Sequence, residues 1–208
     1  MSSTGVLRLI IICLAAYMIG NINPAIILGK IKGIDIRKEG SGNAGMTNTI
    51  RVMGLGAGIT VFIVDVLKGF VAVTLGYSLG STYGAMAAFA GVVLGHCFPV
   101  VFGFKGGKGV ASAFGAALAL NWISALAALL IAGVLFGITR RMSIASLAAA
   151  LAYPVLVWHF KPEYFYFAIC AAAFLMIMHL ANIKRIAKGE EKPLTIGGGN
   201  KEEKEQTK

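Results

Sequence analysis

The chain has 208 residues, of which 57% are hydrophobic and 13% charged, with a mean hydropathy of +0.79, whereas a soluble domain averages ~25% charged residues. This composition excludes a soluble domain and indicates an integral membrane protein. The formal net charge of +10 is typical of the cytoplasmic loops of such a protein, so we expect no nucleic-acid partner.

Apolar segments that are long enough to cross a bilayer follow one another along the chain. A transmembrane helix needs ~20 mostly apolar residues. We assign spans to residues 5–29, 52–77, 82–103, 142–158 and 164–183, with a basic, glycine-containing loop at residues 30–51.

The uncharged stretch at residues 109–139 allows two interpretations. As a single helix it would rise ~46 Å, which exceeds a hydrocarbon core of ~30 Å. Dividing it at Asn121 and Trp122 instead keeps the basic residues of 105–108 and 140–141 on one side of the membrane, as the positive-inside tendency favours. The prediction is an all-α integral membrane protein with about seven transmembrane helices.

The basic residues predict the orientation. Residues 30–51 hold five of them, 105–108 two, 140–141 two and the chain after residue 183 seven, which places 16 on one side, while Arg8 and Lys161 fall on the other. We therefore expect the amino terminus outside and the carboxyl terminus in the cytoplasm. Residues 1–188 are predicted to be a single membrane domain, and the polar residues 189–208 a disordered cytoplasmic tail.

Carboxylates are scarce. Before residue 190 they are Asp35, Glu39, Asp65 and Glu163, which fall at different depths and on opposite sides of the predicted topology. A metal-dependent transferase needs several carboxylates around its cations. We therefore expect no metal site and no cofactor.

Two loops on the cytoplasmic side are rich in groups that bind anions. The first reads GSGNAGMTNTIR and ends in Arg51, and the second reads GFKGGKGVAS and contains Lys108. Glycines allow turns whose N–H groups point at an anion, and the start of a helix attracts negative charge. The second loop lacks the spacing of a Walker loop.

A third polar group ends the last predicted span. His179, Asn182 and Arg185 recur every three residues and therefore form one polar wedge of a helix. Ser143 and Ser146 begin the sixth span on the same side, and helix capping or bonding to a preceding carbonyl is the favoured interpretation for Ser143.

Several intramembrane residues keep two interpretations. Asp65 and Lys68 have the spacing of an ion pair, which either stabilises the fold or supports the site below it. His96 and Pro99 either support the GFKGGKG loop or pack in the core. Gly91 and Gly95 are typical of a close helix contact.

These motifs carry a resemblance to a known family. SGNAGMTN at residues 41–48, KGGKG at 105–109 and HLANIKRI at 179–186 resemble, in order and spacing, the three motifs of the bacterial acyl-phosphate:glycerol-3-phosphate acyltransferases. The resemblance covers residues 5 to about 187 and also includes DVLKG and GHCFPVVFGFKGGKGVAS. Ile186 departs from it conservatively, since the family's third motif usually ends in Leu.

The resemblance implies transfer of a fatty acyl group from acyl phosphate to the 1-hydroxyl of glycerol 3-phosphate, which yields lysophosphatidic acid and inorganic phosphate. It also implies a bacterial plasma membrane, a cytoplasmic active site and no obligate protein partner. The catalytic residues that it implies are Ser41, Arg51, Lys108 and His179. The substrate-binding residues that we expect are Gly42, Asn43, Gly45, Thr47, Asn48, Gly106, Gly107, Gly109, Ser146 and Asn182.

Because a serine nucleophile needs an oriented base, we expect Ser41 and His179 to position substrate, with His179 as a hydrogen-bond donor. The alternative function is a membrane transporter of an organic phosphate or another anion. Transporter sites usually lie near the bilayer midplane on broken helices, where this chain offers Asp65 and Lys68. A non-catalytic membrane scaffold is a third interpretation, but it leaves the glycine-rich loops unexplained.

Overall fold

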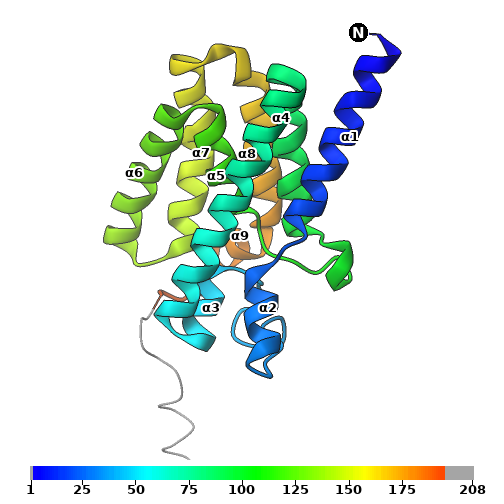
Figure 1. The fold of residues 1–208 in the computed structure, drawn as a ribbon. Coiled ribbons are helices and arrows are strands. Elements are labelled where there is room, and N and C mark those ends of the chain that lie inside the picture. Colours follow the sequence, from blue (N-terminus) through cyan, green and yellow to red (C-terminus); the bar gives the residue numbers. More distant parts are fainter. Residues whose placement is uncertain (1, 195–208) are drawn as a thin grey trace, which may run out of the picture.

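The computed structural model describes residues 2–194 and is a bundle of helices without a strand in that part of the chain (Figure 1). Long helices lie side by side, and three short ones gather at the end opposite the amino terminus. The helices are α1 (Ser3–Gly20), α2 (Pro24–Ile31), α3 (Met46–Met53), α4 (Leu55–Cys97), α5 (Val110–Leu120), α6 (Trp122–Thr139), α7 (Met142–Phe160), α8 (Phe165–Met178) and α9 (Leu180–Ala187), with 3-10 turns at Val100–Phe102 and Pro162–Tyr164.

Helix α4 is a hairpin of two helices. Its backbone leaves the helical conformation at Gly80 and at Ser81, where φ is 52°. Gly76 of the first half lies directly against the Gly84 carbonyl of the second half, because neither residue has a side chain to hold the backbones apart. The two halves correspond to the predicted spans 52–77 and 82–103.

The predicted division of residues 109–139 is confirmed. Asn121 ends α5 and caps α6, because its Oδ1 accepts from the backbone N–H groups of Ile123 and Ser124 at 3.2 and 3.3 Å. The 11 residues of α5 rise only ~16 Å, less than the ~30 Å core. Among the described residues, four helices are long and apolar enough to cross a membrane, or five if the bent pair α8 and α9 counts as one. Seven complete crossings and the orientation remain predictions.

One predicted span contains a helix break, and two predicted boundaries are wrong. Ser3–Ile31 is one of the four candidate spans, but its helix is interrupted, because Asn23 caps a new helix by accepting from Ile26 N–H at 3.1 Å and Pro24 occupies its first turn. The end of the predicted first loop is helical from Met46 onward. The last predicted span bends by 64° between α8 and α9, at His179.

Helix α1 packs tightly against α4. Gly91 and Gly95 lie against the backbone carbonyls of Cys13 and Tyr17, where a Cβ atom would clash. The predicted close helix contact is therefore confirmed. The Tyr17 hydroxyl also donates to the Phe98 carbonyl at 2.7 Å, which connects this contact to the GFKGGKG loop.

Part of the predicted tail is ordered. Glu191 and Leu194 are each 8% exposed, and Leu194 N–H donates to the Arg140 carbonyl at 2.8 Å. The interpretation of residues 189–208 as disordered is therefore wrong for residues 189–194, which pack on the helical domain. Residues 195–208 lie outside the described residues.

Candidate active site

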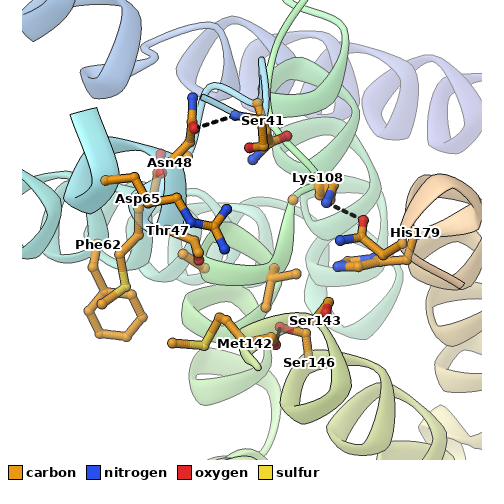
Figure 2. A pocket seen from close by; sticks show the side chains of 18 of the residues that line it. Ser41, Thr47, Asn48, Phe62, Asp65, Lys108, Met142, Ser143, Ser146 and His179 are labelled. Carbon is orange, nitrogen blue, oxygen red and sulfur yellow. Dashed lines mark hydrogen bonds between the residues drawn. The ribbon is translucent and has the colours of Figure 1, made fainter. Parts of the chain in front are cut away.

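A polar cavity of about 140 Å³ lies where the two glycine-rich loops meet α3, α7 and α9 (Figure 2). Lys108 and His179 stand on one side of it, Thr47 and Asn48 on the opposite side, and Ser143 and Ser146 on a third. The structure thus brings together three motifs that are far apart in the sequence. The predicted residues that line the cavity are Ser41, Asn43, Gly45, Thr47, Asn48, Arg51, Lys108, Gly109, Ser146, His179 and Asn182.

Asn48 orders the first loop. Its Oδ1 accepts from Ser41 N–H at 2.8 Å, and its Nδ2 donates to the carbonyls of Ile36 and Glu39 at 3.1 and 3.0 Å. All the hydrogen atoms of this amide are used within the protein, so Asn48 positions Ser41 rather than binding substrate directly. Asn23, which the sequence interpretation missed, supports the same loop by donating to the Ala44 carbonyl at 3.3 Å.

Three predicted binding glycines do not line the cavity. The N–H groups of Gly106 and Gly107 donate to the carbonyls of Cys97 and His96, each at 3.1 Å, and Gly42 N–H donates to Glu39 at 2.9 Å. In this structure these three N–H groups are paired with protein carbonyls rather than directed at the cavity, and the substrate-binding role of the three glycines stays a prediction. The glycines instead let the loops pass close to neighbouring backbone.

The anion-binding backbone comes from two helix starts. Gly45 and Gly109 are the residues directly before helices α3 and α5, and neither helix has a side-chain cap. Their first-turn residues Thr47 and Val110 line the cavity. The first N–H groups of a helix lack partners within the helix and carry the positive end of its dipole. Two such ends at one cavity favour phosphate groups there.

Lys108 supplies a buried cation. Its Nζ donates to Asn182 Oδ1 (Figure 2). Burial lowers the pKa of the Lys108 ammonium to about 8, helped by the nearby charges of Arg185 and Arg51, while Glu191 opposes this effect. Lys108 therefore stays largely charged at neutral pH and is poised to pair with an anion.

His179 lies at the bend between α8 and α9 and is 4% exposed. Its Nδ1 is 2.8 Å from the Leu175 carbonyl. Because a carbonyl can only accept, Nδ1 carries the proton, and Nε2 of the neutral ring is an acceptor. The neutral His179 ring therefore donates to Leu175 from Nδ1 and offers Nε2 to the cavity as an acceptor, and its expected role as a donor to substrate stays a prediction.

Glu191 is the site residue that the sequence interpretation missed. Its Oε1 accepts from Ser143 Oγ at 2.7 Å and from Asn182 Nδ2 at 2.8 Å, and its Oε2 accepts from Arg185 Nε at 2.7 Å. Burial raises the pKa of the Glu191 carboxyl, but these three hydrogen bonds outweigh burial and hold that pKa below its usual value. The sequence signal for the contact between Glu191 and Arg185 was their separation of six residues. Ser143 therefore makes a tertiary contact, contrary to the favoured interpretation.

Two other predicted residues have partners of their own. Ser146 Oγ donates to the Met142 carbonyl at 2.8 Å, one turn earlier in α7, and its oxygen can still accept from a ligand. Arg51 Nη2 is 3.4 Å from the Lys192 carbonyl, so its guanidinium joins the cavity rim to the chain end.

An apolar cavity of about 160 Å³ adjoins the polar one. The two share five lining residues, which are Phe62, Val110, Ala111, Met142 and Ser146. The apolar cavity lies between α4, α5, α6, α7 and α8 and is lined by many alanines, together with Phe89 and Tyr153. Together the two cavities match a molecule with a phosphate at one end and a hydrocarbon chain at the other.

Within the described residues, the cavity has no cluster of acidic side chains that could hold a metal ion. Among residues 2–194, no group of three or more His, Cys, Asp or Glu side chains is arranged to hold a metal ion. The carboxylates that line the cavity, Asp65 and Glu191, are both paired with cationic side chains. The cavity therefore has the donors that bind anions.

The amino-acid sequence is similar to those of known proteins. The sequence model of the glycerol-3-phosphate acyltransferase family matches residues 10–189. A glycerol-3-phosphate acyltransferase of Actinobacillus succinogenes is 41% identical over 180 residues, which cover 85% of this chain and 90% of that protein. One of Alkaliphilus metalliredigens is 36% identical over 186 residues, covering 89% and 95%.

The fold is also similar to a crystal structure. PlsY (YgiH), described as an integral membrane glycerol 3-phosphate acyltransferase in its glycerol 3-phosphate form, superposes with a TM-score of 0.84 at 34% identity, covering 93% of this chain and 96% of that one. Its lysophosphatidic acid form gives 0.81 at 33% identity, covering 92% and 95%.

Proposed function

Since this chain belongs to the glycerol-3-phosphate acyltransferase family, we propose that it transfers a fatty acyl group from acyl phosphate to the 1-hydroxyl of glycerol 3-phosphate. The products are lysophosphatidic acid and inorganic phosphate. Family membership favours this enzyme over the anion transporter that the sequence alone left open.

The observation that carries the proposal is the junction of the two cavities. Phosphate groups suit the polar cavity, because it combines two uncapped helix starts with Lys108 and Arg51. A fatty acyl chain suits the apolar cavity beside it. Acyl phosphate contains both parts, and the glycerol 3-phosphate form of PlsY supports the second substrate.

The arrangement supports direct attack of the glycerol 3-phosphate hydroxyl on the acyl phosphate. The oxygen of the glycerol 3-phosphate hydroxyl bonds to the acyl carbonyl carbon, and the bond between that carbon and the phosphate oxygen breaks. Nε2 of His179 is the acceptor that orients the hydroxyl, and the proton ends on the released phosphate, whose second pKa is near neutrality. A mixed anhydride is already activated, so the residues present suffice without a metal ion.

Ser41 serves as a positioning group in this scheme. Its backbone N–H is fixed by Asn48. Among the described residues, its Oγ has no hydrogen bond to His179, whose Nδ1 is paired with Leu175. A nucleophilic serine requires an adjacent base, so we propose that no acyl group is carried on Ser41.

We further propose that the cavity faces the cytoplasm of a bacterium from its plasma membrane. The 16 basic residues that fall on one side of the predicted topology support this orientation, and Lys105, Lys108, Arg140 and Arg141 belong to the loops beside the cavity. Both phosphorylated substrates would then enter from the cytoplasm, while the acyl chain stays in the bilayer.

The test is the reaction itself. Purified protein in detergent receives acyl phosphate and glycerol 3-phosphate, and phosphate and lysophosphatidic acid are measured together. We expect equal amounts of both products and a loss of most turnover in Lys108→Ala. Lys105→Ala is the matched control, because Lys105 belongs to the same loop but is exposed outside the cavity. Phosphate release that does not depend on glycerol 3-phosphate would contradict the proposal.

A further inference from the structure

A buried polar group inside α4 reaches the cavity floor. Asp65 and Lys68 in the first half of α4 meet His96 in the second half, and their side chains are at most 4% exposed. Lys68 Nζ is 2.6 Å from Asp65 Oδ1 and 2.9 Å from His96 Nδ1. It also donates to the Ile22 carbonyl at 2.7 Å. Asp65 and His96 line the polar cavity, and the scheme above gives neither a role.

The contacts of Lys68 assign the tautomer of His96. An ammonium group has three hydrogen atoms and no acceptor. Lys68 Nζ has four neighbours, because it also lies 3.2 Å from the Gly20 carbonyl, and its three shortest contacts are those to Asp65, Ile22 and His96. Since the ammonium can only donate, the contact of 2.9 Å is a hydrogen bond that His96 Nδ1 accepts, which is shorter than the 3.2 Å between Nδ1 and Asp65 Oδ1. In the neutral imidazole the proton then lies on Nε2.

His96 Nε2 lies directly against Gly107, where a Cβ atom would clash with the ring. His96 lines the polar cavity, and within residues 2–194 the hydrogen bonds of its ring are made by Nδ1 and not by Nε2. The N–H group at Nε2 is therefore free to donate to an acceptor on a ligand in the cavity.

We infer that His96 is a further catalytic residue, which donates a hydrogen bond from Nε2 to an oxygen of the bound substrates, and that Lys68 and Asp65 are positioning residues that hold its tautomer. The inference rests on the proposed function for the identity of the substrates. Gly107 then has a supporting role, because its missing side chain leaves the space that the His96 ring occupies.

Two substitutions separate the two ends of the imidazole. In His96→Asn the short amide keeps a polar partner for Lys68 but does not reach the position of Nε2. In His96→Gln the longer amide reaches that position with an N–H donor. We expect kcat/KM of His96→Asn to fall about 100-fold with an unchanged melting temperature, and His96→Gln to recover part of the loss. His159→Asn is the matched control, since His159 is exposed at the far end of α7.

A spectroscopic measurement keeps the test decisive if a variant does not fold. The ¹⁵N chemical shifts of histidine distinguish a protonated Nε2 from a protonated Nδ1 in the wild-type protein, and His96→Gln assigns the signal. We expect Nε2–H for His96, and the Nδ1–H tautomer would overturn the inference. Activity of His96→Asn within twofold of wild type would also overturn it, whereas an inactive wild-type protein would count against the proposed function instead.

Discussion

The pKa of Lys108 predicts how activity depends on pH. The ammonium form pairs with phosphate, and its pKa is lowered to about 8, so the cation is present below this pH and is lost above it. One titrating group leaves about a tenth of the protein with charged Lys108 at pH 9. Because kcat/KM reports the groups of the free enzyme, we expect kcat/KM to fall about tenfold for each pH unit above 8.

The substrates do not account for such a decrease, since phosphate monoesters lose their second proton near pH 6. Lys108→Arg gives the sharper version of the experiment, because guanidinium does not titrate in this range. We expect this variant to lose the decrease above pH 8 while keeping part of its activity. Initial rates of lysophosphatidic acid formation between pH 6.5 and 9.5 measure the profile.

Lys105→Arg is the control and should keep the wild-type profile, because Lys105 is exposed in the same loop. A profile of Lys108→Arg that still falls above pH 8 would refute the assignment, as would a wild-type profile that stays flat up to pH 9.5. Glu191→Gln adds a directional check. Glu191 opposes the lowering of the Lys108 pKa, so its removal should move the decrease to lower pH.

Three further outcomes are expected. Glu191→Ala removes two buried hydrogen bonds to a carboxylate, from Ser143 and Asn182, which are worth about 1.5–3 kcal/mol each. Thermal unfolding in detergent should therefore show that the free energy of unfolding falls by about 3–6 kcal/mol. An unchanged melting curve would contradict this role of Glu191. Activity should persist in excess chelator, and a strict requirement for added magnesium would show that a metal ion takes part. In a cysteine-free background, an impermeant thiol reagent added to intact cells should label Glu163→Cys but not Lys105→Cys, and the reverse pattern would refute the orientation.

Sequence patterns predicted the parts of the fold that depend on hydrophobicity and charge. The split at Asn121 followed from helix length and from the sidedness of basic residues, because both arise from the bilayer itself. The close contact of α1 with Gly91 and Gly95 followed from the absence of side chains. The interruption after Gly20 was missed because a single apolar run hid the capping role of Asn23.

The site was predicted as a set of residues but not as a geometry. Lys108, Asn182 and His179 converge as expected, because they end spans on the same side. The pairing of the N–H groups of Gly106 and Gly107 with carbonyls of α4 depends on how the loop folds back, which residue spacing does not show. The composition of the tail suggested disorder, and the partners that bury Glu191 lie on α7 and α9.

The bond between Glu191 and Ser143 has a consequence for synthesis of the chain on the ribosome. The cavity wall draws on residues from Ser41 to Glu191, so the site is complete only when almost the whole chain has been translated. A nascent or prematurely terminated chain that ends before α9 contains the glycine loops but lacks Asn182 and Glu191. Such fragments would therefore lack a finished cavity.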